Sequence, residues 1–225
     1  MDYKEKLQEE EYDRPYHWLL GGVANLQYLL KVQIVIRIIG NLKSKKILDI
    51  GCGDGRFTSF LAKEGAEVYG VDYSERALRF AKVLVPNAKF VRMDSYRLGF
   101  KASYFDVVTL IDTIEHLKKD KEEQTLREIK KVLKPNGLVI LSTVSNKIRV
   151  NKKHYRHYSE QQLREILGKY FSDIKIIGYV RYVPLYLKFV KYQNYPIISK
   201  IGRAITKECS PKKAVHLIAY GVKKS

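Results

Sequence analysis

The chain contains 225 residues, of which 45% are hydrophobic and 29% are charged, and it has a formal net charge of +18 at pH 7. This length and apolar content suffice for one full core, so we expect a single domain or a domain with an extension. The two cysteines, Cys52 and Cys209, exclude a disulfide framework and a cysteine-rich metal cluster.

The N-terminal 45 residues precede the first expected strand. Residues 2–14 are highly charged and predict a helix or a disordered arm, without the pattern of a signal peptide, so we expect a cytoplasmic protein. Residues 19–40 are long enough to span a membrane, but polar and charged side chains interrupt them, which argues against a span. Within this stretch, residues 24–39 fit both a helix and an alternating strand; their length favours a helix that packs on a sheet.

Residues 46–55 combine a short apolar strand with a glycine-rich turn. The strand at 47–50 leads into Gly51, Gly53 and Gly55, and a helical pattern follows from Arg56. Glycine permits a sharp turn and a close approach of the backbone to a ligand. Strand, glycine turn and helix open a nucleotide-binding βαβ unit.

Two acidic residues accompany this turn. Asp49 stands two positions before Gly51, and Asp72 ends the next apolar run, 21 residues after that glycine. An acid at this distance reaches ribose hydroxyls. With these residues the sequence resembles the class I S-adenosylmethionine-dependent methyltransferases: residues 49–55 are similar to their first motif, and residues 71–74 to their second.

This resemblance implies a fold and a cofactor site. The expected fold is α/β, a doubly wound, mostly parallel, seven-stranded Rossmann-like sheet with antiparallel C-terminal strands. S-adenosylmethionine is the implied cofactor, with Asp72 on the ribose, the glycines and Asp49 near the methionine part, and Asp94 and Ser95 near the adenine. Residues 1–45 would form a helical cap over the cofactor mouth, and 46–225 the methyltransferase domain. The expected cofactor-binding residues are Tyr16, Trp18, Asp49, Gly51, Cys52, Gly53, Asp72, Tyr73, Asp94, Ser95, Ile111 and Asp112.

Strands and helices continue to alternate through residue 144. Strands are expected at 68–71, 89–92, 105–112 and 138–141, with a turn at 134–137 before the last of them. Such alternation predicts a parallel sheet with helices on both faces. The segment 113–117 resembles the Glu-His-Leu segment of small-molecule methyltransferases.

Candidate catalytic groups follow the fourth strand. His116 lies where the resemblance places the methyl group, and an imidazole suits removal of a proton at neutral pH; a structural role for His116 is the alternative. His154 and His157 are further candidates. Since no Cys, His or acid cluster accompanies this pair in the sequence, we expect no metal.

The last third of the chain is strongly basic. Residues 145–225 hold 18 lysines and arginines against four acids. Strands are expected at 174–179 and 214–222, and a basic, aromatic insertion lies between them at about 181–210, with Pro184 and Pro196 beginning two short helices. This composition favours an anionic membrane surface or RNA as a partner, with a lysine-rich solvated surface as the alternative.

The sequence therefore predicts a methyltransferase that acts on an oxygen or nitrogen of a small-molecule, sugar-like or lipid-linked acceptor. An RNA methyltransferase is the first alternative, although no RNA-binding module is recognisable. A cofactor-binding scaffold without activity is a second alternative. A dinucleotide-dependent oxidoreductase is a third, weakened by the spacing of the glycines.

Overall fold

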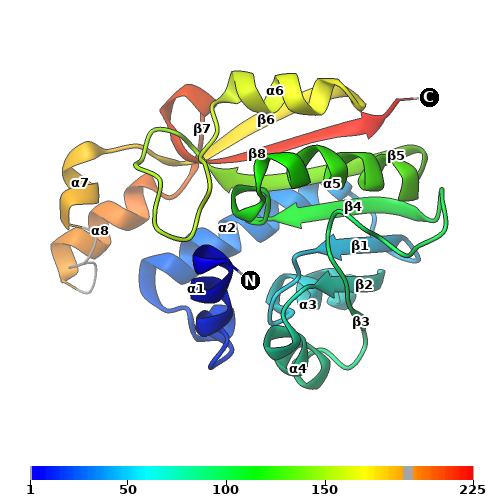
Figure 1. Ribbon diagram of the computed structural model, residues 1–225. Helices are drawn as coiled ribbons and strands as arrows, with labels where there is room; N and C mark the ends of the chain where they lie inside the picture. Colours follow the sequence, from blue (N-terminus) through cyan, green and yellow to red (C-terminus); the bar gives the residue numbers. More distant parts are fainter. Residues whose placement is uncertain (1, 190–194, 225) are drawn as a thin grey trace.

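A computed structural model describes residues 2–189 and 195–224, which form one mixed sheet flanked by helices (Figure 1). The sheet has eight strands in the order β3-β2-β1-β4-β5-β8-β6-β7. The first five strands in this order are parallel, whereas β8, β6 and β7 are antiparallel to their neighbours. The strands are β1 (Lys46–Ile50), β2 (Glu67–Asp72), β3 (Lys89–Arg92), β4 (Phe105–Ile111), β5 (Leu133–Val144), β6 (Phe171–Arg181), β7 (Glu208–Cys209) and β8 (Ala214–Lys223).

The expected α/β class, the parallel core and the antiparallel C-terminal strands are confirmed, but the expected number of strands is wrong. The eighth strand is β7, a two-residue segment that pairs with Gly178 and Tyr179 of β6. A strand of two residues has no hydrophobic alternation to reveal it in a sequence.

Helices cover both faces of the sheet because successive strand residues point to opposite sides. Ile47 of β1 and Val107 of β4 pack in one core cluster with α2 and α3, whereas Leu48 and Val108 pack in the other with α5 and α6. The helices are α1 (Tyr3–Glu11), η1 (Tyr16–Leu19), α2 (Gly22–Ile39), α3 (Arg56–Lys63), α4 (Glu75–Leu84), η2 (Ile114–His116), α5 (Lys119–Val132), α6 (Glu160–Gly168), α7 (Pro184–Phe189), α8 (Pro196–Ile205) and η4 (Pro211–Lys213).

The expected helix at 24–39 is confirmed as α2. Among the described residues, α2 is the one helix whose length and composition would allow it to cross a membrane, and 39% of it is buried inside the protein. Its Val32, Ile34 and Val35 are almost fully buried and pack in the core cluster on its face of the sheet. The helix that these polar residues interrupt therefore covers the sheet.

The expected turn at 134–137 is wrong as an element of its own. Helix α5 ends at Val132, and β5 begins at Leu133 and includes these residues. A register shift accommodates them, since Phe105 pairs with Leu133 and Val107 with Leu138. Asn136 in this irregularity has φ of 59°.

The insertion between β6 and β8 forms α7, α8 and β7, and Pro184 and Pro196 begin the two helices as expected. Lys191 and Tyr192, two of its basic and aromatic residues, lie outside the described residues.

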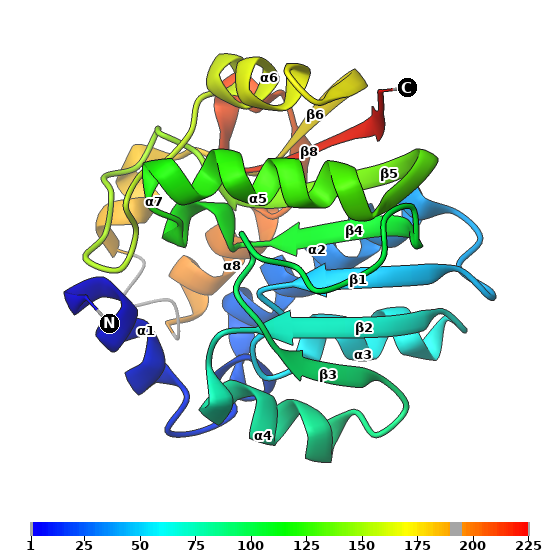
Figure 2. The same cartoon turned by 45° about the vertical axis from the view of Figure 1, so that its right-hand side comes forward.

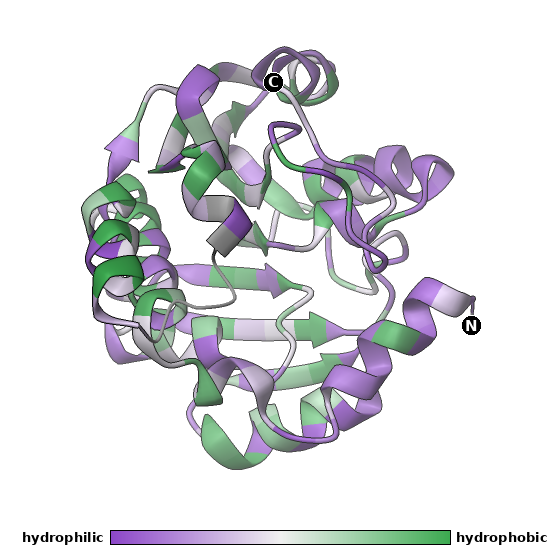
Figure 3. Ribbon diagram, turned by 90° about the vertical axis from the view of Figure 1, so that its left-hand side faces the viewer, coloured by the Kyte–Doolittle hydropathy of each residue, from purple (hydrophilic) through white to green (hydrophobic). Residues whose placement is uncertain are grey.

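The carboxyl ends of β1, β2 and β4 point to one end of the sheet, where α1, α7 and the loop at 145–158 gather (Figures 1 and 2). Helix α1 has no buried residue and is mainly hydrophilic (Figure 3). Ligands of open α/β sheets bind at the carboxyl ends of the strands.

Candidate functional site

The glycine turn after β1 is tied to the end of β2. The backbone N–H groups of Gly51 and Cys52 both donate to the carbonyl of Val71, at 2.8 and 3.1 Å. Gly51 has φ of 70°, and a Cβ at this position would collide with the side chain of Thr113. Only glycine therefore fits both the left-handed backbone and the space beside Thr113.

Asp72 lies at the carboxyl end of β2 and faces the same turn. Its Oδ2 accepts a hydrogen bond from the Gly53 N–H and its Oδ1 one from the Ser74 N–H, both at 2.9 Å. Burial raises the pKa of Asp72 to about 6, although these two hydrogen bonds stabilise the carboxylate. The side chain is therefore held in one orientation, with its remaining lone pairs available to a ligand.

These strand ends border a cavity of about 580 Å³. This volume is within the usual range for small-molecule and cofactor sites. Eight of the twelve residues expected to bind the cofactor line it, together with His116. The eight are Tyr16, Gly51, Asp72, Tyr73, Asp94, Ser95, Ile111 and Asp112.

The other four expected residues lie elsewhere within the described part of the chain. Asp49 and Cys52 lie behind the turn, on a small separate cavity of about 30 Å³. Gly53 is next to Tyr12, whose Oη is 2.5 Å from where a Cβ would stand. Trp18 donates its indole N–H to the Asp54 carbonyl at 2.9 Å, so it supports the loop from outside.

Asp49 contacts the elements next to the glycine turn. Its two oxygens accept hydrogen bonds from the hydroxyls of Thr58, at 2.7 Å, and Thr109, at 2.9 Å. Burial raises the pKa of Asp49 to about 6. These contacts connect the end of β1 to α3 and β4, which makes Asp49 a positioning residue in the structure.

Helix α1 and the turn after it close one side of the cavity. Glu5, Gln8, Glu11 and Tyr12 line it, whereas the residues expected from the segment before the first strand were Tyr16 and Trp18. Lys118 pairs with Asp2 at 3.0 Å, and the Lys4 ammonium donates to the His154 carbonyl at 2.6 Å. The sequence shows charged residues in this segment and possible partners far away in the chain, but it does not show which of them pair.

Asp112, at the end of β4, lines the cavity as expected and also forms an ion pair that the sequence did not reveal. Its carboxylate pairs with Lys31 of α2 and accepts a hydrogen bond from the Ser142 hydroxyl at 2.6 Å. Burial opposes ionisation, but the Lys31 ammonium holds the pKa of Asp112 well below its ordinary value. In the sequence Lys31 was only a charge that interrupts an apolar helix.

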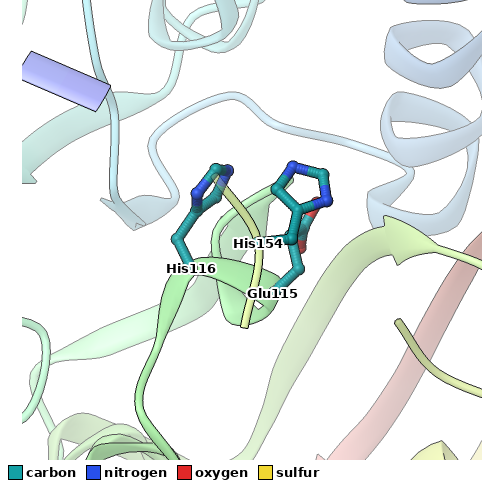
Figure 4. Close-up of side chains that lie close together, drawn as sticks. All are labelled: Glu115, His116 and His154. Atoms are coloured by element: carbon teal, nitrogen blue, oxygen red, sulfur yellow. The ribbon is translucent and has the colours of Figure 1, made fainter. Parts of the chain in front are cut away.

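Glu115, His116 and His154 form a compact cluster at the cavity wall (Figure 4). Glu115 and His116 come from η2 and His154 from the loop after β5, and one potential ligand atom of each lies within 4.8 Å of the others. The rings of His116 and His154 meet edge to face, with centroids 4.6 Å apart. Burial lowers the pKa of His116 to about 4 and that of His154 to about 3, so both are neutral at pH 7.

Glu115 is the most deeply buried member of this cluster. Its Oε2 accepts a hydrogen bond from the Thr143 hydroxyl at 2.8 Å. Burial, with the nearby Asp112 charge, raises the pKa of Glu115 to about 8. In the sequence His154 pairs with His157, and Glu115 and His116 lie too far away in the chain to be grouped with them.

Known proteins with similar sequences include methyltransferases. A family model described as a methyltransferase domain matches residues 48–141. A ubiquinone biosynthesis O-methyltransferase of an Azoarcus species is 32% identical over 204 residues, 80% of each chain. The corresponding enzyme of Leptothrix cholodnii is 29% identical over 122 residues, which cover 52% of this chain and about half, 51%, of that relative.

Solved structures share the fold. A Thermotoga maritima methyltransferase, described as a possible histamine N-methyltransferase, has a TM-score of 0.71 at 22% identity, over 99% of this chain and 98% of that one. Phosphoethanolamine N-methyltransferase 2 of Haemonchus contortus, in complex with S-adenosylmethionine, has a TM-score of 0.63 at 20% identity, over 87% of this chain and 52% of that one. Because a relative named as a methyltransferase is 32% identical over 80% of each chain, and the methyltransferase domain model matches the segment with the glycine turn, the chain belongs to the class I S-adenosylmethionine-dependent methyltransferases.

Proposed function

We propose that the protein transfers the methyl group of S-adenosylmethionine to a hydroxyl oxygen of a small amphiphilic acceptor. The relatives named as ubiquinone biosynthesis O-methyltransferases support an oxygen acceptor. Asp72 would accept hydrogen bonds from the ribose hydroxyls, because its carboxylate lines the cavity at the end of β2. Asp94 and Ser95, on the same wall, would meet the adenine.

The cofactor supplies the activated methyl group, so the protein has to align the acceptor and exclude water. The segment 2–45 would act as the cap that does this. The ion pair of Lys118 with Asp2 and the hydrogen bond from Lys4 to His154 fasten α1 across the cavity. Tyr73 donates to the Glu5 carbonyl at 3.3 Å and adds a contact on the cofactor side.

One observation carries the choice of a hydroxyl acceptor. His116 and His154 place two neutral imidazoles on the cavity wall, next to the buried carboxyl group of Glu115. A hydroxyl must lose its proton for the methyl transfer to be completed, and such a cluster can promote that loss. A tertiary amine acceptor would need no such group.

The test is methyl transfer from labelled S-adenosylmethionine to catechol, phenol and aniline probes. We expect product from the hydroxyl probes, and we expect His116→Ala to lower kcat by roughly 100-fold or more. The affinity for S-adenosylhomocysteine should stay within about threefold, since His116 lies away from Asp72 on a different strand end. Product from aniline alone would contradict the choice of an oxygen acceptor.

We also propose that α7 and α8 rest on an anionic bilayer from which an amphiphilic acceptor is taken. Leu185, Ile197 and Ile201 expose apolar side chains, with Ile197 exposed to 74%. The neighbouring Lys200 and Arg203 are exposed as well. Apolar side chains flanked by cations are typical of a helix that lies in an anionic membrane interface.

Flotation with phosphatidylglycerol vesicles tests this surface. The protein should float with these vesicles and much less with phosphatidylcholine vesicles, and Ile197→Asp should weaken the binding. Val83→Asp, which makes the same charge change at an apolar position of α4 that is 78% exposed, is the comparison for net charge outside the insertion. Equal loss in both variants, or tighter binding to transfer RNA than to the anionic vesicles, would contradict the membrane proposal.

A further inference from the structure

We propose that Glu115, His116 and His154 bind a divalent transition-metal ion at the wall of the cofactor cavity. One ligand atom of each residue lies within 4.8 Å of the others, and the three side chains converge (Figure 4). In a tetrahedral site with bonds near 2.1 Å, the ligand atoms are about 3.4 Å apart. A closing movement of at most about 1.4 Å between the ligand atoms, within the reach of small side-chain rotations, would therefore complete the site.

Two buried atoms of this cluster have no hydrogen-bond partner among the described residues. Glu115 Oε1 and His116 Nδ1 are buried and accept or donate no hydrogen bond within that part of the protein. A buried polar atom without a partner costs about 1–3 kcal/mol. A single cation that accepts lone pairs from both atoms would remove this cost.

The third ligand follows from a chain of hydrogen bonds. His157 Nδ1 lies 3.0 Å from the Ile148 carbonyl and must donate to it, which leaves His157 Nε2 as an acceptor. His154 Nδ1, 2.8 Å from that nitrogen, is then the donor, so the lone pair of His154 is on Nε2. The amide of Asn151, 3.2 Å from this Nε2, faces it as a donor that a metal ion would displace.

The donor set indicates the class of metal. Two imidazole nitrogens and one carboxylate oxygen suit Zn²⁺, Mn²⁺, Fe²⁺ or Co²⁺ and not the all-oxygen sites of Mg²⁺ or Ca²⁺. The Thr143 hydroxyl on Glu115 Oε2 and the His157 ring on His154 would orient the ligands from behind. Since His116 and His154 line the cavity, the open coordination positions would face it.

The inference deepens the proposed function and rests on it for the role of the metal. An acceptor hydroxyl that coordinates the ion loses its proton to water at a lower pH, and the electron pair of the O–H bond stays on the oxygen. That pair forms the new O–C bond as the C–S bond of the cofactor breaks and its pair leaves with the sulfur. His116 is then a metal ligand, and an acceptor with two adjacent oxygens would occupy two positions of the ion.

A titration of chelator-treated, full-length protein with Co²⁺, followed by its visible absorption, tests the site without any turnover. We expect saturation at one ion per chain, with bands typical of nitrogen and oxygen ligands. Glu115→Gln and His154→Ala should each weaken Co²⁺ binding by roughly tenfold or more. Glu123→Gln, a matched change on the exposed face of α5, should leave it unchanged.

Circular dichroism and S-adenosylhomocysteine affinity show whether each variant is folded; if Glu115→Gln unfolds, His154→Ala in the loop carries the test. No saturable Co²⁺ binding, or equal binding in the wild type and in folded His154→Ala, would overturn the metal site. Methyl transfer that persists undiminished after chelation would overturn the role of the ion in proton loss. Metal binding without methylation of any hydroxyl probe would instead count against the proposed acceptor and leave the metal site standing.

Discussion

The replacement of Asp72 by asparagine tests the proposed cofactor site most directly. Both carboxylate oxygens accept backbone hydrogen bonds at 2.9 Å, from Gly53 and from Ser74. An asparagine keeps the size of the side chain but has a single oxygen, so in either orientation its NH₂ group faces one of the two N–H donors. The change therefore disturbs the glycine turn and also removes the charged acceptor for a ribose hydroxyl.

The magnitude follows from the bonds that are lost. A hydrogen bond to a charged group contributes about 1.5–3 kcal/mol, so the loss of one such bond to the ribose predicts a decrease of the same size in binding free energy. This corresponds to a Kd for S-adenosylhomocysteine that is roughly 10- to 150-fold higher. Isothermal titration calorimetry at pH 7.5 measures it, with Asp120→Asn, whose side chain is 65% exposed on α5, as the matched control.

The same carboxylate predicts a pH dependence. The pKa of Asp72 is raised to about 6, and the ionised form is the one that accepts the ribose hydrogen bonds. Affinity should be constant above about pH 7 and should fall by up to about tenfold per unit below pH 6. Asp72→Asn should flatten this profile. A folded Asp72→Asn protein that binds within about threefold of the wild type, with an unchanged pH profile, would refute the reasoning.

Three further variants test the surroundings of the site. Gly51→Ala should abolish measurable S-adenosylhomocysteine binding, because a Cβ collides with Thr113 and the left-handed backbone alone costs about 1–2 kcal/mol. Asp49→Asn should stabilise the protein more at pH 7.5 than at pH 4. Burial raises the pKa of Asp49 from 3.8 to about 6, so the ionised side chain lowers the free energy of unfolding above pH 6, by at most about 3 kcal/mol. Thermal or urea unfolding measures this difference. Lys31→Met should lower the free energy of unfolding in urea by roughly 2 kcal/mol, because it leaves Asp112 without its cation.

Matched controls separate these effects from general sensitivity. Gly168→Ala adds a Cβ at the end of α6, where nothing lies within 4 Å, and should be neutral for binding. Lys119→Met removes an exposed ammonium from the first turn of α5 and should change stability little. Equal effects of Gly51→Ala and Gly168→Ala would contradict the steric argument. A Lys31→Met variant as stable as the wild type, or an Asp49→Asn effect that does not change with pH, would contradict the electrostatic ones.

The parts of the fold that were predicted correctly depend on neighbouring residues. Pro184 and Pro196 begin helices because their φ is preset. The turn at 134–137 failed for the opposite reason. Its residues have local turn preferences, but pairing between Phe105 and Leu133, distant in the chain, draws them into β5.

The candidate site likewise contains residues that local sequence patterns predicted and residues that they did not. Gly51, Asp72 and Asp94 line the cavity as expected because each ends a strand or follows one within two residues, and parallel strands end at one edge of a sheet. Trp18 was expected at the cofactor and Tyr12 was not, but Tyr12 lines the cavity and Trp18 does not, since nothing local distinguishes two aromatic residues of one segment. The fold points Tyr12 to the glycine turn, whereas Trp18 donates to the back of the loop.

The sequence by itself determined the class of the protein: the βαβ opening, the glycine turn and the acid after the second strand are local patterns that physical chemistry and a family resemblance can interpret. Only the tertiary structure decided which charges meet. Lys31 with Asp112 and His154 with Glu115 lie far apart in the chain and come together because α2 and the loop after β5 pack at the end of β4. Such pairings depend on packing between distant segments, and the composition of either segment alone carries no signal for them.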